Sequence, residues 1–231
     1  MASLADATRA ELDRLGAHYF LDIRATARRL LEGMAGPARA AFAAAVTERL
    51  LRENERRPAR ERRPYGETWR PVLEAVWRGL GGDALAVRQV AAAVARFYVS
   101  PDWYDRRHDD PADADDHAIM AACYAAECCL HGCLDFACWA GWRGFDAATL
   151  RAAGDTGWPH RRPAGVSGYA WELAHPCIQS ELEQQLSDLE LLAGDGGVLI
   201  DPAADRRPLL DRLRESEPDH PQPPEAQPSS N

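Results

Sequence analysis

The sequence AIMAACYAAECCLHGCLDFACWAGW, from Ala118 to Trp142, is the most apolar stretch of the chain and decides its fold. It is long enough to cross a membrane, but Glu127, His131 and Asp135 lie in its middle, where charged groups are costly in lipid. Nearly all its sides are apolar, as is typical of a helix buried in a protein core. We therefore expect one helix from Ala118 to about Gly141, at the centre of a compact all-α multi-helix bundle.

Segments on both sides of this stretch also have a helical pattern. Apolar residues at intervals of three and four predict helices over about residues 5–32, 38–56, 69–80, 83–99 and 176–193, and a short one near 203–214. Asp83 is the expected N-cap of the fourth of these, and Pro71 fits only the first turn of the third. No alternating pattern long enough for a sheet strand occurs.

The last long helix, from about Pro176 to Ala193, has a mixed composition. Ile178, Leu182, Leu186 and Leu189 are expected to face the core. Its polar residues are expected to lie in solvent: Glu181, Glu183, Gln184, Gln185, Asp188 and Glu190.

Length and composition indicate a single domain with a tail. The chain has 231 residues, of which 46% are hydrophobic, enough to bury a core. We predict one helical domain over residues 1–215. Residues 216–231 contain five prolines and no large apolar residue, so we expect a disordered Pro-rich tail. The net charge of −9 argues against a general nucleic-acid or anionic-membrane binder.

The cysteines indicate a reducing compartment. Five of the six lie between Cys123 and Cys138, without the spacing of a disulfide framework or of zinc knuckles. The start of the chain has no apolar segment of the kind found in signal peptides. We expect reduced thiols, a cytoplasmic protein, and no metal or cofactor.

Four segments follow one another in an order that is found in a known family. They are FAAAVTERLL at Phe42–Leu51, PVLEAVWRGL at Pro71–Leu80, AIMAACYAAE at Ala118–Glu127, and His175-Pro176 followed by QSEL at Gln179–Leu182. In order and spacing, over roughly residues 40–193, they resemble the YjaG-like family of uncharacterised bacterial proteins. The resemblance implies a compact all-α domain and, because the family has no established activity, no particular reaction.

Glu127, His131 and Asp135 are the strongest candidates for chemistry. On one continuous helix they would form a stripe at positions i, i+4 and i+8. A carboxylate–imidazole–carboxylate stripe can bind a metal or act as an acid–base unit. The simpler interpretation is that the central helix has one solvent-facing edge, stabilised by i,i+4 pairs.

Other candidates have weaker patterns. Trp158 lies in a Gly-Trp-Pro loop, where an exposed aromatic side chain would favour a protein contact. The acidic run 108–116 lacks the glycine and the terminal glutamate of an EF-hand, so a solvated loop is favoured. The arginine-rich run 52–63 has no interleaved aromatic residues of the kind that bind single-stranded nucleic acid, which favours a charged connector.

These features lead to three functional hypotheses. The first is a non-catalytic protein-interaction protein, in a specific form an immunity or antitoxin-like partner, because the chain is small, acidic and without a catalytic motif. The second is a metal-assisted hydrolase using Glu127, His131 and Asp135. The third is a homo-oligomeric structural protein with an apolar helix face as its contact. We expect a protein partner, and neither nucleic acid nor membrane.

Overall fold

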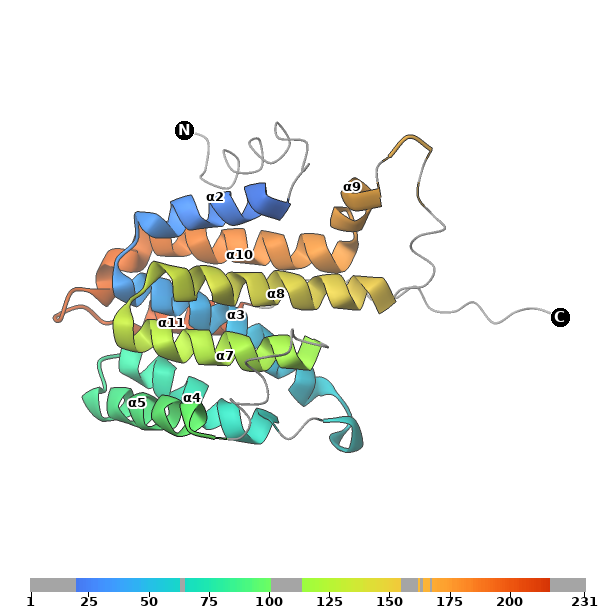
Figure 1. Cartoon of the computed structure of the whole chain (residues 1–231). Coiled ribbons are helices and arrows are strands. Elements are labelled where there is room, and N and C mark those ends of the chain that lie inside the picture. The colour runs from blue at the N-terminus through green and yellow to red at the C-terminus, as the bar shows by residue number, and fades with distance from the viewer. Residues whose placement is uncertain are drawn as a thin grey trace.

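The computed structural model describes residues 20–62, 65–100, 114–154, 162, 164–166 and 168–216. Its elements are α2 (Phe20–Glu32), α3 (Gly36–Arg56), η1 (Ala59–Glu61), α4 (Tyr65–Leu80), α5 (Ala84–Tyr98), α7 (Ala114–His131), α8 (Leu134–Gly154), α9 (Gly168–Leu173), α10 (Pro176–Asp195), η3 (Gly196–Leu199) and α11 (Arg207–Glu215). Within these ranges there is no strand, and the long helices pack side by side (Figure 1). The predicted all-α bundle is confirmed.

α3 is the most continuously buried helix of the bundle. The predicted helix over Ala118–Gly141 is divided between α7 and α8, and α7 also lies in the core, in contact with α3, α4, α5 and α8. α3 contacts α4, α7, α8, α10 and α11. Every residue from Ala40 to Leu51 is buried. The run of alanines before Val46 lets neighbouring helices approach α3 closely on several sides, whereas a helix with one apolar stripe packs on one side only.

The segment 114–154 is a helical hairpin rather than one long helix. α7 ends at His131, where the N–H of Gly132 donates to the carbonyl of Cys128 at 2.7 Å, and α8 begins at Leu134. Gly132 has a φ of +61°, in the left-handed region that glycine adopts readily at helix ends. A Cβ atom there would lie 2.9 Å from the Cα of Gly36, so the turn packs directly on the first residue of α3.

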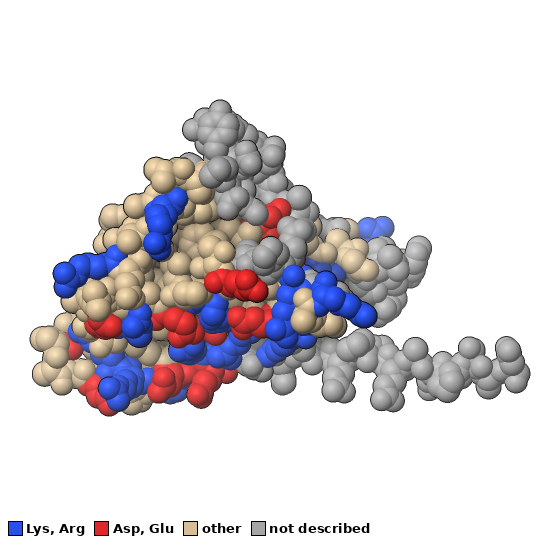
Figure 2. All heavy atoms as spheres, turned by 90° about the horizontal axis from the view of Figure 1, so that it is seen from below, with Lys and Arg blue, Asp and Glu red and all other residues tan. Residues whose placement is uncertain are grey.

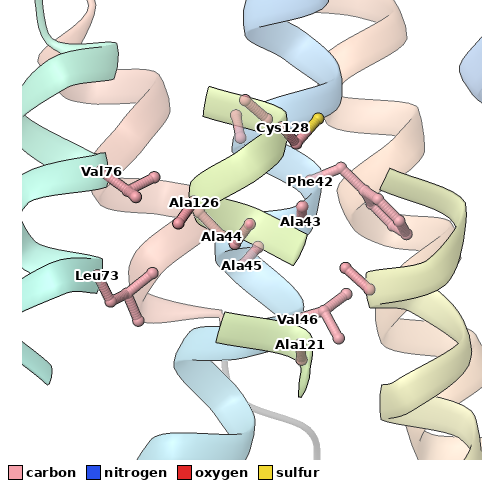
Figure 3. Packing of buried hydrophobic residues seen from close by; sticks show 14 of the residues in the cluster. Phe42, Ala43, Ala44, Ala45, Val46, Leu73, Val76, Ala121, Ala126 and Cys128 are labelled. Carbon is pink, nitrogen blue, oxygen red and sulfur yellow. The ribbon is translucent and has the colours of Figure 1, made fainter. Parts of the chain in front are cut away.

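The largest packing interface joins α3 with the α7–α8 hairpin and α4. In Figure 3, Phe42 and Val46 of α3 point toward α8, and Leu73 and Val76 of α4 point toward the alanines of α3 and α7. All four of these side chains are buried. On one side of this core lie α4 and α5, and on the other lie α10 and α2 (Figure 1).

The predicted helix ends are largely confirmed. The carboxylate of Asp83 caps α5 by accepting from the N–H groups of Leu85 and Ala86, as expected. α10 begins at Pro176, and His175 caps it through Nδ1, which accepts from the N–H of Cys177. The prediction for Pro71 is wrong, because α4 begins at Tyr65 and places this proline inside the helix. Pro71 is exposed, so water can satisfy the carbonyl that its missing N–H leaves without a helical bond.

Several predictions fall outside the described residues. They concern the start of the first helix before Phe20, the loop residue Trp158, most of the acidic run 108–116, and the tail after Ser216. Among the helices that are described, none is both long enough and apolar enough to span a bilayer.

The close contact between Gly132 and Gly36 gives a stability prediction. We expect Gly132→Ala to lower the free energy of unfolding by about 1–3 kcal/mol, because the added methyl group meets backbone and the left-handed conformation disfavours a Cβ. The matched control is Gly194→Ala in α10, where nothing lies within 4 Å of the added Cβ. The control should raise stability by roughly 0.5–1 kcal/mol. Urea unfolding measures both, and equal effects would contradict the proposed contact.

Candidate functional site

Glu127 and His131 form a polar pair at the seam between α5 and α7. The Oε2 atom of Glu127 lies 3.2 Å from Nε2 of His131, and its Oε1 accepts from the hydroxyl of Tyr98 at 2.5 Å. Glu127 is only 5% exposed, whereas the His131 side chain is 61% exposed. Burial, together with this hydrogen bond, raises the pKa of Tyr98 above its ordinary value, so the phenol stays protonated and donates. Glu127 is therefore a buried bridge, not part of a solvent-facing edge.

Asp135 does not join this pair, so the predicted stripe of three residues is wrong. The chain reverses at Gly132, which places Asp135 in the first turn of α8. There its Oδ1 pairs with Nη1 of Arg28 from α2 at 2.5 Å. No group of three or more potential metal ligands occurs in the part of the chain that the structure describes. Asp135 therefore does not supply the third ligand that the predicted stripe gave to a metal-assisted hydrolase.

Three of the six thiols are buried and protected rather than reactive. All six cysteines are free, as the sequence predicted, and Cys123, Cys128 and Cys138 are buried. Burial raises the pKa of Cys123 and of Cys128 to about 12, and that of Cys138 to about 11. A thiol with so high a pKa holds almost no thiolate at neutral pH, so these side chains act as small apolar groups in the core.

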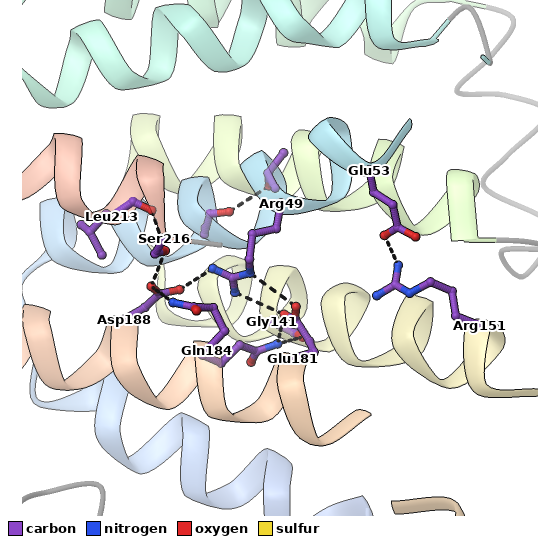
Figure 4. Close-up of polar contacts among 12 residues, drawn as sticks. Arg49, Glu53, Gly141, Arg151, Glu181, Gln184, Asp188, Leu213 and Ser216 are labelled. Carbon is purple, nitrogen blue, oxygen red and sulfur yellow. Dashed lines mark hydrogen bonds and ion pairs between the residues drawn. The ribbon is translucent and has the colours of Figure 1, made fainter. Parts of the chain in front are cut away.

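The main polar site is one that the sequence analysis missed: a buried ion-pair network around Arg49. Its guanidinium forms two hydrogen bonds to Glu181, at 3.2 and 3.4 Å, and one to Asp188 at 2.6 Å (Figure 4). Arg49 is 7% exposed, Glu181 4% and Asp188 1%. Burial works against its charge, but the two carboxylates outweigh this and raise the pKa of Arg49 above its ordinary value. The network joins α3 to α10.

Further hydrogen bonds complete this Arg49 network. The side-chain amide of Gln185 donates to Glu181 at 2.8 Å and to the carbonyl of Gly141 in α8 at 2.9 Å. Ser216, directly after α11, donates its hydroxyl to Oδ1 of Asp188 at 3.2 Å. Burial raises the pKa of Asp188, and Arg49 reduces that shift without cancelling it.

Two glycines of α8 make room for the network. A Cβ atom at Gly144 would lie 2.5 Å from Oε1 of Glu181 and 2.8 Å from Val46. One at Gly141 would lie 3.1 Å from the side-chain oxygen of Gln185. The surface of α8 is therefore hollowed where the carboxylate and amide of α10 enter.

A second network lies around the neighbouring residue, Glu48. Its Oε1 accepts from Arg52 at 2.9 Å and from Arg70 at 2.8 Å, and its Oε2 accepts from the indole N–H of Trp77 at 3.0 Å. Arg214 of α11 approaches Oε2 at 3.8 Å. Burial acts to raise the pKa of Glu48, but Arg70, Trp77 and Arg214 outweigh it, and the pKa lies below its usual value. Glu48 and Arg49, about 100° apart on the helix, thus connect two adjacent sides of α3 to α4, α11 and α10.

The sequence does contain a signal for the Arg49 network. Glu181, Gln185 and Asp188 follow the spacing i, i+4 and i+7, the same face as the buried Ile178 and Leu192. The expectation that these three polar residues lie in solvent is wrong. Polar residues at positions that the apolar pattern assigns to the core call for a buried partner of opposite charge.

The geometry of the two networks is suited to holding helices together. Each of the three carboxylates is buried and accepts hydrogen bonds on both of its oxygens, so none of them is placed to take a proton from a substrate. A shallow hollow of about 620 Å³ lies between α10 and α11, with Asp188 and Ser216 among its lining residues. Glu190, Asp195, Glu215 and Arg212 also line it, so its charge is mainly acidic.

No family model, no curated protein and no solved structure matches this chain. The four segments that resemble the YjaG-like family lie in α3, α4 and α7 and at the start of α10. Membership of that family stays a prediction from those segments.

Removing the cation of the Arg49 network tests its energetic role. We expect Arg49→Met to destabilise the protein by about 3–5 kcal/mol at neutral pH, because two buried carboxylates lose their counter-charge. The loss should be smaller near pH 4, because burial already raises the pKa of Asp188, its pKa rises further without Arg49, and its carboxyl is then protonated. Urea unfolding at both pH values measures this.

A matched control and a rescue make this test specific. Arg52→Met also removes an arginine of α3, but this side chain is 26% exposed, so it should cost less than about 1 kcal/mol. Replacing Arg49, Glu181 and Asp188 together by apolar residues should recover most of the stability. A large loss in the triple variant would show that Arg49 acts by shape rather than by charge.

The lowered pKa of Glu48 predicts a pH-dependent contribution. Ionised Glu48 stabilises the fold above its unfolded-state pKa of about 4.3, and this stability is lost as pH falls through its lower pKa in the folded protein. We expect Glu48→Gln to destabilise most near pH 7 and least near pH 3. Unfolding free energies measured across this range check the prediction, which a pH-independent difference would contradict.

Proposed function

We propose that this chain is a non-catalytic protein-interaction protein and that the outer face of α5 is its contact surface. The observation that carries the proposal is the exposure of large apolar side chains on α5: Leu85 is 59% exposed and Val99, at the C-cap, is 84% exposed. Ala91, Ala92 and Ala95, which lie between Leu85 and Val99 in the sequence, are also exposed.

The inner face of α5 already has its partners. Ala86, Val90 and Val94 are buried where α5 packs against α4 and α7. Phe97 contacts Trp69 of α4, with ring centroids 5.0 Å apart. The outer face is therefore not needed to hold α5 in the fold. Apolar side chains that protrude there gain about 25 cal/mol per Å² when a partner removes them from water.

The side of the protein on which α4 and α5 lie has both charged and less charged areas. The view from below, the side on which α4 and α5 lie, shows acidic and basic side chains interleaved over its lower part and a less charged area above (Figure 2). Trp139, Leu150 and Ile200, other exposed apolar residues, are scattered over α8 and the segment after η3. Among the described residues, α5 with its C-cap residue carries three exposed large apolar side chains, those of Leu85, Tyr98 and Val99.

Two further features support a binding role over a catalytic one. Asp135 is paired with Arg28, which leaves Glu127 and His131 without the third group of the proposed hydrolase site. The buried carboxylates of the two networks are occupied by arginines. An immunity or antitoxin-like role is the specific form of the proposal, supported by small size and the net charge of −9. Six free thiols support a cytoplasmic location.

Site-specific photo-cross-linking in the native host tests the contact surface. A photo-reactive residue is placed at Ala92 on α5 and, as the control, at Ala193, an exposed alanine of α10. We expect a discrete adduct with another protein from position 92 only, and its loss when Leu85→Ser and Val99→Ser are added. Equal adducts at both positions would contradict the proposed surface, and an adduct between two copies alone would favour the homo-oligomer.

A further inference from the structure

We infer that the outer face of α5 binds an acidic amphipathic helix of a different protein. This inference rests on the proposed function, because it names the partner chemistry for the same surface. The face is defined by Leu85, Arg88, Ala92, Arg96 and Val99, all of which are exposed.

The spacing of these residues makes a straight stripe along the helix. Steps of three and four residues from Leu85 to Val99 keep the side chains on one side, opposite the buried Val90 and Val94. At a rise of 1.5 Å per residue, the stripe is about 21 Å long. That length fits about four turns of a partner helix.

The middle of the stripe is shaped for another helix. Ala92, in the middle of the stripe, and Ala91 and Ala95 beside it are exposed and carry only a methyl group, whereas Leu85 and Val99 protrude at the two ends. A partner helix can approach the alanines closely and rest its own apolar side chains between the two ends. The helix-in-groove mode of recognition uses apolar anchors at the same spacing.

The charge of the stripe selects the partner. α5 contains Arg88 and Arg96 and no acidic residue. The whole chain has a net charge of −9, so without these two arginines it would be −11. An acidic partner is therefore repelled by the protein as a whole and attracted to α5, which directs it to this face. Carboxylates beside an apolar stripe would meet the two guanidinium groups.

The same charges disfavour a second copy of this chain as the occupant. In an antiparallel pair centred on Ala92, Arg88 of one copy lies level with Arg96 of the other, because both are four residues from the centre. In a parallel pair, each arginine lies level with its own equivalent. Like charges brought together at a helix interface oppose pairing.

The test uses two synthetic amphipathic helices with identical apolar positions. One carries glutamates beside its apolar stripe, and the other carries lysines at those positions. Fluorescence anisotropy at low salt measures their binding to the full chain, to the double variant Arg88→Glu/Arg96→Glu, and to Arg207→Glu/Arg212→Glu. The last is the control, because it makes the same change in net charge at two exposed positions of α11.

We expect the wild-type chain to bind the acidic helix at least tenfold more tightly than the basic one. The α5 double variant should reverse this preference, and the α11 control should keep it. Binding should weaken as salt is raised. Circular dichroism of each variant confirms folding, which exposed substitutions leave intact.

Three results would overturn the inference. They are the absence of binding to either helix, the absence of a charge preference, and an equal loss of acidic-helix binding in the α11 control. A fourth contrary result would come from sedimentation of the wild-type chain and of the double variant Leu85→Ser/Val99→Ser. If the wild-type chain is a dimer and the double variant is a monomer, a second copy covers the face. If cross-linking at Ala92 succeeds while the helices show no charge preference, the contact surface stands and only the acidic helix is wrong.

Discussion

The burial of α3 with two opposite charges on consecutive residues is the constraint on which the rest of the structure depends. Glu48 is 2% exposed and Arg49 is 7% exposed. A buried charge without a partner is far more costly than a lost surface contact. The helices around α3 must therefore supply counter-charges as well as apolar surface. α4 and α11 do so for Glu48, and α10 does so for Arg49.

This requirement explains features that are otherwise unrelated. α8 has glycines where Glu181 and Gln185 enter, because a larger residue at Gly144 would collide with the carboxylate. α10 has polar residues on the side that an isolated amphipathic helix would make apolar. The two networks also fix the angular position of α3, since rotating it would withdraw Glu48 and Arg49 from their partners together. Apolar packing among alanines has little directional preference, and the ion pairs supply it.

The sequence predicted the elements that depend on local chemistry. Asp83 before α5 and His175-Pro176 before α10 mark helix starts through their capping atoms and proline geometry, which act within a few residues. It did not predict the break at Gly132, because a glycine in an apolar run is also compatible with a buried helix, and the deciding contact with Gly36 is distant in sequence. Arg49 and Glu181 are 132 residues apart, so no local pattern connects them. The spacing of apolar residues predicted the helix α5 but not which of its faces is exposed, because exposure depends on which neighbouring helices pack against it.

The order of α3 and its partners along the chain has a consequence for how the protein is made. Translation releases α3 before the α7–α8 hairpin that covers it and the carboxylates of α10 that neutralise Arg49. The nascent chain therefore holds an alanine-rich helix without its cover until α10 has been synthesised. Folding that depends on such distant segments is slow and exposes apolar surface to other chains. The nascent chain thus depends most on chaperones in the interval between the synthesis of α3 and that of α10.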